Sequence, residues 1–142
     1  LAKVIAMGPA SPLFQRINAD RAGFLKNLAR TVRRMHFCGL SMRDLKAANV
    51  LVYPDDGRVA VMLSDLEDID LYARGVPERK AIQNIARLYA DAVFLDAVSR
   101  REAVEFLGDY LGPCDRGRFL RWMSGIREYA GAKCRSLKRT GI

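Results

Sequence analysis

The sequence predicts an α+β fold, mainly α-helical, that forms one domain of 142 residues. Half of the residues are hydrophobic (50%), which is enough to build a core in a chain of this length. Apolar residues recur at helical spacing over much of the chain. Among these helical stretches are two short apolar segments, 50–53 and 59–63, with turn-forming residues between them at 54–57. This arrangement predicts a small β-hairpin within a largely helical domain.

Four amphipathic helices are expected in the remaining sequence. They begin near residues 18, 77, 99 and 115. Asn18 is suited to cap the first helix, which Gly39 ends, and Ser99 with Glu102 forms a capping box at the start of the third. Gly112 and the following proline end that third helix. The expected apolar faces contain Phe24, Leu25, Leu28, Val32 and Met35; Ile82, Ile85, Tyr89, Ala92 and Val93; and Phe119, Leu120, Trp122, Met123 and Ile126.

The two ends of the chain are expected to differ from this helical body. Residues 4–7 are apolar and are predicted as a strand that stops at the Gly-Pro turn. Residues 133–142 form a basic tail. The three cysteines are widely spaced without a Cys-x-x-Cys pair, which favours reduced thiols over a zinc site or a disulfide framework.

The most informative segment is 42–49, which reads Met-Arg-Asp-Leu-Lys-Ala-Ala-Asn. Asp44 and Asn49 lie on one loop before the first strand, and the hairpin returns the chain to Asp65 beside Asn49. Phosphoryl transfer needs a carboxylate to orient and deprotonate an acceptor hydroxyl, and oxygen donors to hold Mg²⁺ against the nucleotide's phosphates. Asp44 is suited to the first task, and Asn49 and Asp65 to the second. We therefore predict a phosphoryl-transfer site at one end of the hairpin.

This pattern resembles the catalytic loop and the metal-binding loop of the protein-kinase-like superfamily. Within it, the sequence is most similar to the lipopolysaccharide kinases, which phosphorylate Kdo or heptose sugars of the inner core. The second aspartate stands in Asp-Leu-Glu-Asp rather than Asp-Phe-Gly, and the segments 33–40 and 79–88 also resemble that family. The resemblance covers about residues 4–130. It implies a kinase-like C-terminal lobe in which Lys46, the second catalytic residue, steadies the charge on the transferring phosphate.

The chain also departs from the family pattern in two ways. Met42 replaces the family's usual histidine, whose hydrogen bonds brace the loop, and a thioether accepts hydrogen bonds only weakly. The sequence contains no glycine-rich phosphate loop and no strand lysine with a helix glutamate partner. The N-terminal lobe is therefore expected to be missing, with 1–12 as the remnant of its last strand and the hinge.

The resemblance implies transfer of phosphate from ATP to a sugar hydroxyl of a lipopolysaccharide core or a similar glycolipid, with Mg²⁺ as cofactor. The isolated lobe is expected to have negligible activity, because half of the nucleotide cleft would be absent. A noncatalytic binding module, related to a kinase but degenerate, is the first alternative. A fragment of a Ser/Thr protein kinase is the second.

The formal net charge of +8 points to anionic partners, although a merely solvated basic surface explains it equally well. No RNA- or DNA-binding module is recognisable, so nucleic acid is not expected as a partner. An anionic glycolipid acceptor is the better explanation, in the cytoplasm or at the cytoplasmic face of the inner membrane.

The neighbouring charged residues have less specific expectations. Arg43 is expected to pair with a carboxylate near the metal-binding loop, and His36 to be a hydrogen-bonded core residue. Glu67 and Asp68 are either auxiliary metal acids or exposed loop carboxylates.

Overall fold

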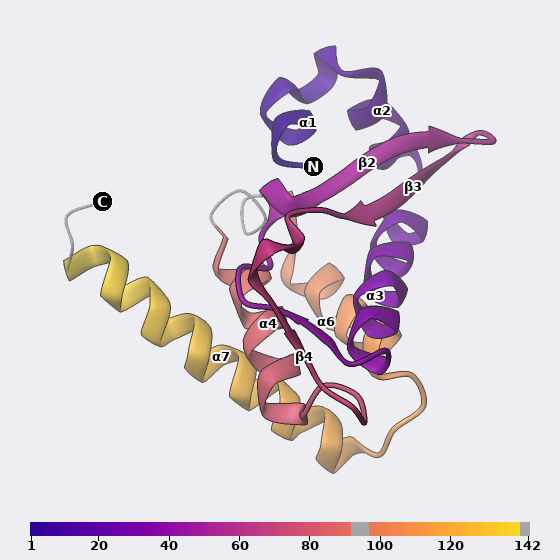
Figure 1. Cartoon of the computed structure of the whole chain (residues 1–142). Coiled ribbons are helices and arrows are strands. Elements are labelled where there is room, and N and C mark those ends of the chain that lie inside the picture. Colours follow the sequence, from indigo (N-terminus) through magenta and orange to yellow (C-terminus); the bar gives the residue numbers. More distant parts are fainter. Residues whose placement is uncertain (92–96, 140–142) are drawn as a thin grey trace.

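The structure is a computed structural model that describes residues 1–91 and 97–139, with 66 and 133–139 as backbone only. Helices surround two separate two-stranded antiparallel sheets (Figure 1), which confirms the predicted mainly helical α+β class. The elements in chain order are α1 (Ala2–Met7), η1 (Gly8–Ala10), α2 (Pro12–Ala19), α3 (Arg21–Phe37), β1 (Leu40–Met42), η2 (Ala47–Asn49), β2 (Val50–Asp55), β3 (Arg58–Leu63), η3 (Leu66–Asp68), β4 (Ile69–Leu71), α4 (Glu78–Ala90), α6 (Arg100–Leu111) and α7 (Arg116–Arg139).

The first long helix, α3, is the centre of the fold. Its apolar face is buried as predicted, with Leu28 and Val32 fully buried, and it packs against α6. The predicted cap is wrong, because Asp20 rather than Asn18 accepts a hydrogen bond from the backbone N–H of Gly23, at 2.9 Å. Asn18 lies inside α2, which continues to Ala19 and leaves Asp20 as the residue between the two helices. This residue is therefore the one whose side chain can reach the unpaired amides of α3.

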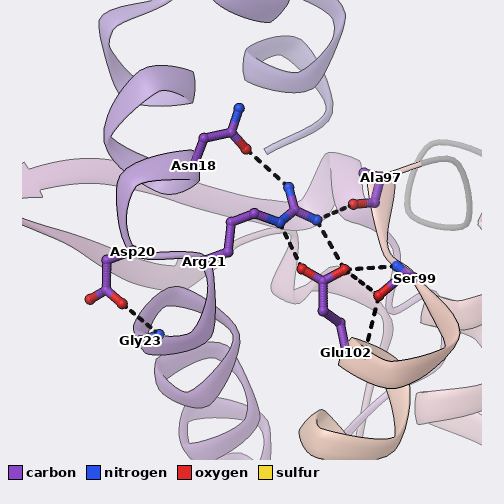
Figure 2. Close-up of polar contacts among 7 residues, drawn as sticks. All are labelled: Asn18, Asp20, Arg21, Gly23, Ala97, Ser99 and Glu102. Carbon is purple, nitrogen blue, oxygen red and sulfur yellow. Dashed lines mark hydrogen bonds and ion pairs between the residues drawn. The ribbon is translucent and has the colours of Figure 1, made fainter.

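Arg21 connects the start of α3 to the start of α6 (Figure 2). Its guanidinium donates two hydrogen bonds to Glu102, at 2.7 and 3.2 Å, one to the carbonyl of Ala97 at 2.5 Å and one to Asn18 at 3.0 Å. Glu102 also accepts from the backbone and hydroxyl of Ser99, which confirms the predicted capping box. Hydrogen bonding to Arg21 lowers the pKa of Glu102 to about 2. One ion pair therefore orients both helices at their N-termini.

The later helices follow the sequence prediction closely. α4 begins after Pro77, and α6 ends before Gly112. Ile85 is buried in α4, whereas the predicted stripe residues at 92 and 93 lie outside the described residues. α7 packs along α4 and continues as helix through the first part of the predicted basic tail, to residue 139. The sequence contains no proline after position 113, and α7 continues through Gly131.

The predicted hairpin is present as β2 and β3, paired in register from Val50 with Leu63 to Asp55 with Arg58. Two residues form the turn, Asp56 and Gly57, with φ of 39° and 80°. Positive φ at both turn positions is the geometry that matches the twist of a two-residue hairpin. The tight turn fixes the register and so fixes which residues stand at the other end of the hairpin.

A second, short sheet was not expected from the sequence. β1 pairs antiparallel with β4, with Ser41 opposite Asp70 and Met42 opposite Ile69. Gly39 makes this connection possible, because it has φ of 81° and an added Cβ would lie 2.0 Å from the carbonyl oxygen of Tyr72. Only glycine fits that close approach between backbones.

The prediction of a strand at residues 4–7 is wrong, because the chain forms helix α1 over Ala2–Met7. An isolated strand would leave its backbone groups without partners, whereas a helix satisfies them within the segment. Val4 and Ile5 pack against the core from this helix.

In the described part of the chain, no helix combines the length and apolar character needed to cross a bilayer.

Candidate active site

The loop that follows β1 is shaped by hydrogen bonds within itself. The side-chain amide of Asn49 donates to the carbonyl oxygen of Asp44 at 2.9 Å, and the backbone N–H of Asn49 donates to Lys46 at 3.0 Å. These bonds close the loop over the single turn η2. They place Asp44 and Asn49 at the same edge, directly before β2.

The hairpin brings the predicted third residue to this edge. The backbone N–H of Ser64 donates to the carbonyl oxygen of Asn49 at 2.9 Å, and the next residue is Asp65. Asn49 Nδ2 lies 3.3 Å from Asp65 Oδ2. Asp65 has φ of 66° and ψ of 66°, a left-handed conformation that is uncommon outside glycine. The backbone turns sharply here and aims the carboxylate back at Asn49.

Asn49 and Asp65 have the right chemistry for Mg²⁺. Both Asn49 contacts use its amide nitrogen, and its Oδ1 atom has no hydrogen-bond partner among the described residues. Asn49 is buried, at 7% exposure, whereas Asp65 is exposed. Among the described residues, no three His, Cys, Asp or Glu side chains gather as a metal cluster. Two hard oxygen donors fit Mg²⁺, which usually takes one or two protein ligands and completes its shell with water and phosphate oxygens.

Asp44 and Lys46 face one another across the loop. Lys46 Nζ lies 2.5 Å from Asp44 Oδ2, and the two side chains are 43% and 45% exposed. The hydrogen bond to Asp44 raises the pKa of Lys46. The lysine therefore stays charged beside the carboxylate, and both groups are open to a ligand arriving from solvent.

The Arg43 side chain pairs with the carboxylates of Asp70 in β4 and Asp68 in η3. Its guanidinium donates to Asp70 at 2.8 and 3.1 Å, and its backbone N–H donates to the carbonyl oxygen of Asp68 at 3.0 Å. The hydrogen bond from Arg43 lowers the pKa of Asp70. The expected pairing of Arg43 with a carboxylate near the metal-binding loop is confirmed. Glu67 and Asp68 are exposed and lie in the single turn η3.

A buried polar cluster lies beneath the loop, formed by Ser41, His36, Asn84 and Tyr110. Asn84 Oδ1 lies 3.0 Å from both the Ser41 hydroxyl and His36 Nε2, and His36 Nδ1 lies 2.7 Å from the Tyr110 hydroxyl. His36 is 4% exposed, which confirms it as a hydrogen-bonded core residue. Burial lowers its pKa to about 4. The histidine is therefore neutral near pH 7, with both ring nitrogens hydrogen-bonded.

Two further residues support this region, and the sequence did not reveal their roles. One is Asn84, which the sequence marked only as part of the segment 79–88 that resembles the family. The other is Asp91, at the end of α4, whose Oδ2 accepts a hydrogen bond from the backbone N–H of Ala47 at 2.7 Å. An Asp after a helix is common, so no local signal marked it. Asp91 contacts the loop itself, whereas Asn84 contacts Ser41 in β1, the strand that leads into the loop.

Met42 stands where the resembled family has a histidine, and it is 1% exposed in the hydrophobic core. Its thioether gives the loop no strong hydrogen bond. The loop is instead held through its backbone. The N–H of residue 43 donates to the carbonyl oxygen of Asp68, and the N–H of residue 47 donates to the carboxylate of Asp91. The structure thus supports the loop by backbone hydrogen bonds at two positions after Met42.

A helix leading into a loop that carries Asp44 and Asn49, followed by a hairpin that returns Asp65, defines the C-terminal lobe of a protein-kinase-like fold. The chain belongs to the lipopolysaccharide kinase (Kdo/WaaP) family, whose sequence model matches residues 15–110. Among solved structures, one described as WaaP in complex with acyl carrier protein is similar to it, with a TM-score of 0.66 and 24% identity. That alignment covers 82% of this chain and 49% of the other, so this chain spans about half the length of that protein. No curated protein sequence matches it.

Proposed function

We propose that this chain carries the catalytic loop and the metal-binding edge of an ATP- and Mg²⁺-dependent kinase. Its acceptor would be a sugar hydroxyl of the lipopolysaccharide core or a similar glycolipid. The observation that supports this proposal is the convergence of Asp44, Asn49 and Asp65 at one end of the β2–β3 hairpin. Membership of the lipopolysaccharide kinase family supports the choice of acceptor.

In the proposed reaction, Asp44 accepts a hydrogen bond from the sugar hydroxyl and takes its proton. The sugar oxygen forms a bond to the γ-phosphorus of ATP as the bond to the β,γ-bridging oxygen breaks, and ADP leaves. Lys46 exchanges part of its contact with Asp44 for the oxygens of the transferring phosphate. Asn49 and Asp65 would hold Mg²⁺, which when bound neutralises charge on the phosphates.

The other half of the nucleotide site would come from a small β-rich lobe with a glycine-rich loop and a strand lysine. We place this lobe outside the 142 residues and interpret 1–12 as the connection to it. The isolated chain should then transfer phosphate at a negligible rate, because loose positioning alone can cost many orders of magnitude in rate. The acceptor would be met at the cytoplasmic face of the inner membrane, where the basic surface of the lobe favours an anionic glycolipid.

The metal edge can be tested on the 142-residue chain itself. We expect weak Mn²⁺ binding, seen as paramagnetic broadening of nearby resonances, that Asp65→Asn weakens. This variant removes one charge while keeping a residue type that tolerates the left-handed backbone. Asp109→Asn makes the same charge change at a partly exposed residue on α6, where Asp109 lies 3.9 Å from Lys26; it is the control and should bind Mn²⁺ as the wild type does. Equal binding by both variants would remove Asp65 from the site.

The acceptor is tested on the gene product that contains this chain. ATP-dependent phosphorylation of a core-sugar acceptor would support the assignment. Transfer only to protein serine or threonine would instead favour the protein-kinase alternative. Nucleotide or glycolipid binding without any transfer would favour the noncatalytic module.

A further inference from the structure

A cavity lies at the opposite end of the β1–β4 pair from the loop that carries Asp44. Its volume is about 320 Å³, and its wall includes the end of α3 at Phe37 and the segment after β4 at Arg74. Leu40 pairs with Leu71 at this end of the short sheet, whereas the catalytic loop follows Met42 at the other end. A ligand in this hollow would therefore not touch Asp44.

The wall of this cavity carries uncompensated positive charge. Three arginines line it, Arg33, Arg74 and Arg118, with Glu78 as the one lining carboxylate. Glu78 lies 3.9 Å from Arg118, and both side chains are more than 40% exposed. Arg33 and Arg74 form no ion pair with any residue that the structure describes. Two guanidinium groups are thus left to attract an anion.

Trp122 also lines this cavity, and its side chain carries a buried hydrogen-bond donor. The side chain is 2% exposed and packs beside Tyr110, with ring centroids 5.3 Å apart. Its Nε1 atom is buried and has no hydrogen-bond partner among the described residues. An indole N–H can only donate, and leaving a buried donor unpaired is unfavourable. This atom therefore needs an acceptor that the described chain does not provide.

We propose that this cavity binds the phosphate group of a small phosphorylated ligand. A phosphate monoester carries nearly two negative charges near neutral pH and presents three strong acceptor oxygens. The planar fork of Arg33 or Arg74 matches two of those oxygens, and the indole N–H of Trp122 supplies a neutral donor to another. Three arginines against one glutamate give the cavity a formal charge that complements this dianion. The site is separate from the proposed catalytic edge and does not depend on it.

The chain provides its own reporter for a test, because Trp122 is its one tryptophan. We would titrate the 142-residue protein with inorganic phosphate at constant ionic strength and follow tryptophan fluorescence. Acetate and chloride would be titrated in parallel. We expect a saturable change with phosphate alone. The double variant Arg33→Gln/Arg74→Gln should weaken phosphate binding by at least about tenfold, since it removes both free guanidinium groups.

The control variant is Arg16→Gln/Arg30→Gln, which makes the same charge change in a different basic hollow beside the hairpin tip. It should bind phosphate as tightly as the wild type. Trp122→Phe, followed by calorimetry, should also bind more weakly, because the indole donor is lost.

Equal weakening by the two double variants would show a general charge effect and overturn the proposal. The absence of a saturable response, or the same response to acetate, would also overturn it. Circular dichroism checks that each variant keeps the wild-type fold.

Discussion

The proposed catalytic edge, formed by Asp44, Lys46, Asn49 and Asp65, and the polar cluster beneath it use similar residue types in opposite environments. At the edge, the Asp44 and Lys46 side chains are nearly half exposed, and Asn49 keeps an amide oxygen without a described partner. In the cluster, Asn84 and Ser41 are 1% exposed and hydrogen-bonded within the lobe. The edge therefore has polar groups that are free to bind a ligand, whereas the polar groups of the cluster are already paired with one another.

This difference distinguishes the groups that we propose bind a ligand from the groups that stabilise the fold. Exposed charges at the edge are solvated by water, so they cost little stability. They interact more strongly with a ligand once the ligand displaces that water. Buried polar groups are costly unless each is paired, so the cluster must be complete in the folded lobe itself. Substitutions of the exposed charges at the edge, Asp44 and Lys46, should therefore change chemistry with little effect on stability, and substitutions in the cluster should do the reverse.

The largest effect is expected for Asp44→Asn in the gene product that contains this chain. Losing the carboxylate that accepts the hydroxyl proton should reduce kcat by about 10³-fold. The free energy of unfolding should change little, because the side chain is exposed. Initial-rate kinetics and urea denaturation of the same preparation would measure both. Asp109→Asn is the control for charge, and a large loss of stability in Asp44→Asn would break the contrast between the two regions.

The next effect is the reverse case, Asn84→Ala in the closed cluster. The change removes the acceptor for the Ser41 hydroxyl and the partner of His36 Nε2, leaving buried polar groups unpaired. We expect the free energy of unfolding to fall by about 2–4 kcal/mol. Urea denaturation would measure this loss. Asn27→Ala, an exposed asparagine on α3, is the control, and a similar loss in both variants would contradict the special role of the cluster.

The sequence was informative where a residue's role depends on its neighbours in the chain. Asp44, Asn49 and Asp65 were predicted together because one loop and one hairpin carry all three, and a tight turn fixes their register. Lys46 was added by family resemblance, and its functional role stays a prediction. The caps at Ser99 and the ends at Gly112 and Pro77 are equally local.

The sequence was uninformative where the role depends on packing between distant segments. Asp91 reaches Ala47 across 44 positions, and Asn84 reaches Ser41 across 43. No local sequence signal predicts either contact, because both depend on how α4 packs against segments more than 40 positions away. The strand predicted at 4–7 failed for a related reason. Apolar composition alone does not decide between strand and helix when no partner strand is available in the chain.

A smaller effect should appear as a pH dependence of stability that comes from His36. Its pKa is about 4 in the folded lobe and about 6.5 when the chain is unfolded, so the unfolded state binds more protons in between. Stability is then full above the unfolded value and falls as the pH drops towards the folded value. From about pH 7 to about pH 5 we expect a loss of about 2 kcal/mol. His36 is the one histidine, so its NMR titration measures the folded pKa directly. A value near 6.5 would refute the prediction.

The smallest effect should come from the Arg21–Glu102 ion pair, whose side chains are neither fully exposed nor fully buried. Arg21 is 35% exposed and Glu102 21%, so solvent screens much of their attraction. The pKa of Glu102 is lowered to about 2, and stability from this group is therefore lost as the pH falls from about 4.5 to about 2. After allowing for screening, we expect Glu102→Gln to cost about 1 kcal/mol above that range and less within it. Glu105→Gln on the same helix is the matched control, because its partner Arg101 is 88% exposed and the pair should contribute almost nothing. Denaturation midpoints of both variants at several pH values would measure the difference. If both variants lose the same stability at neutral pH, the junction between α3 and α6 does not depend on this pair, and its stability comes from apolar packing alone.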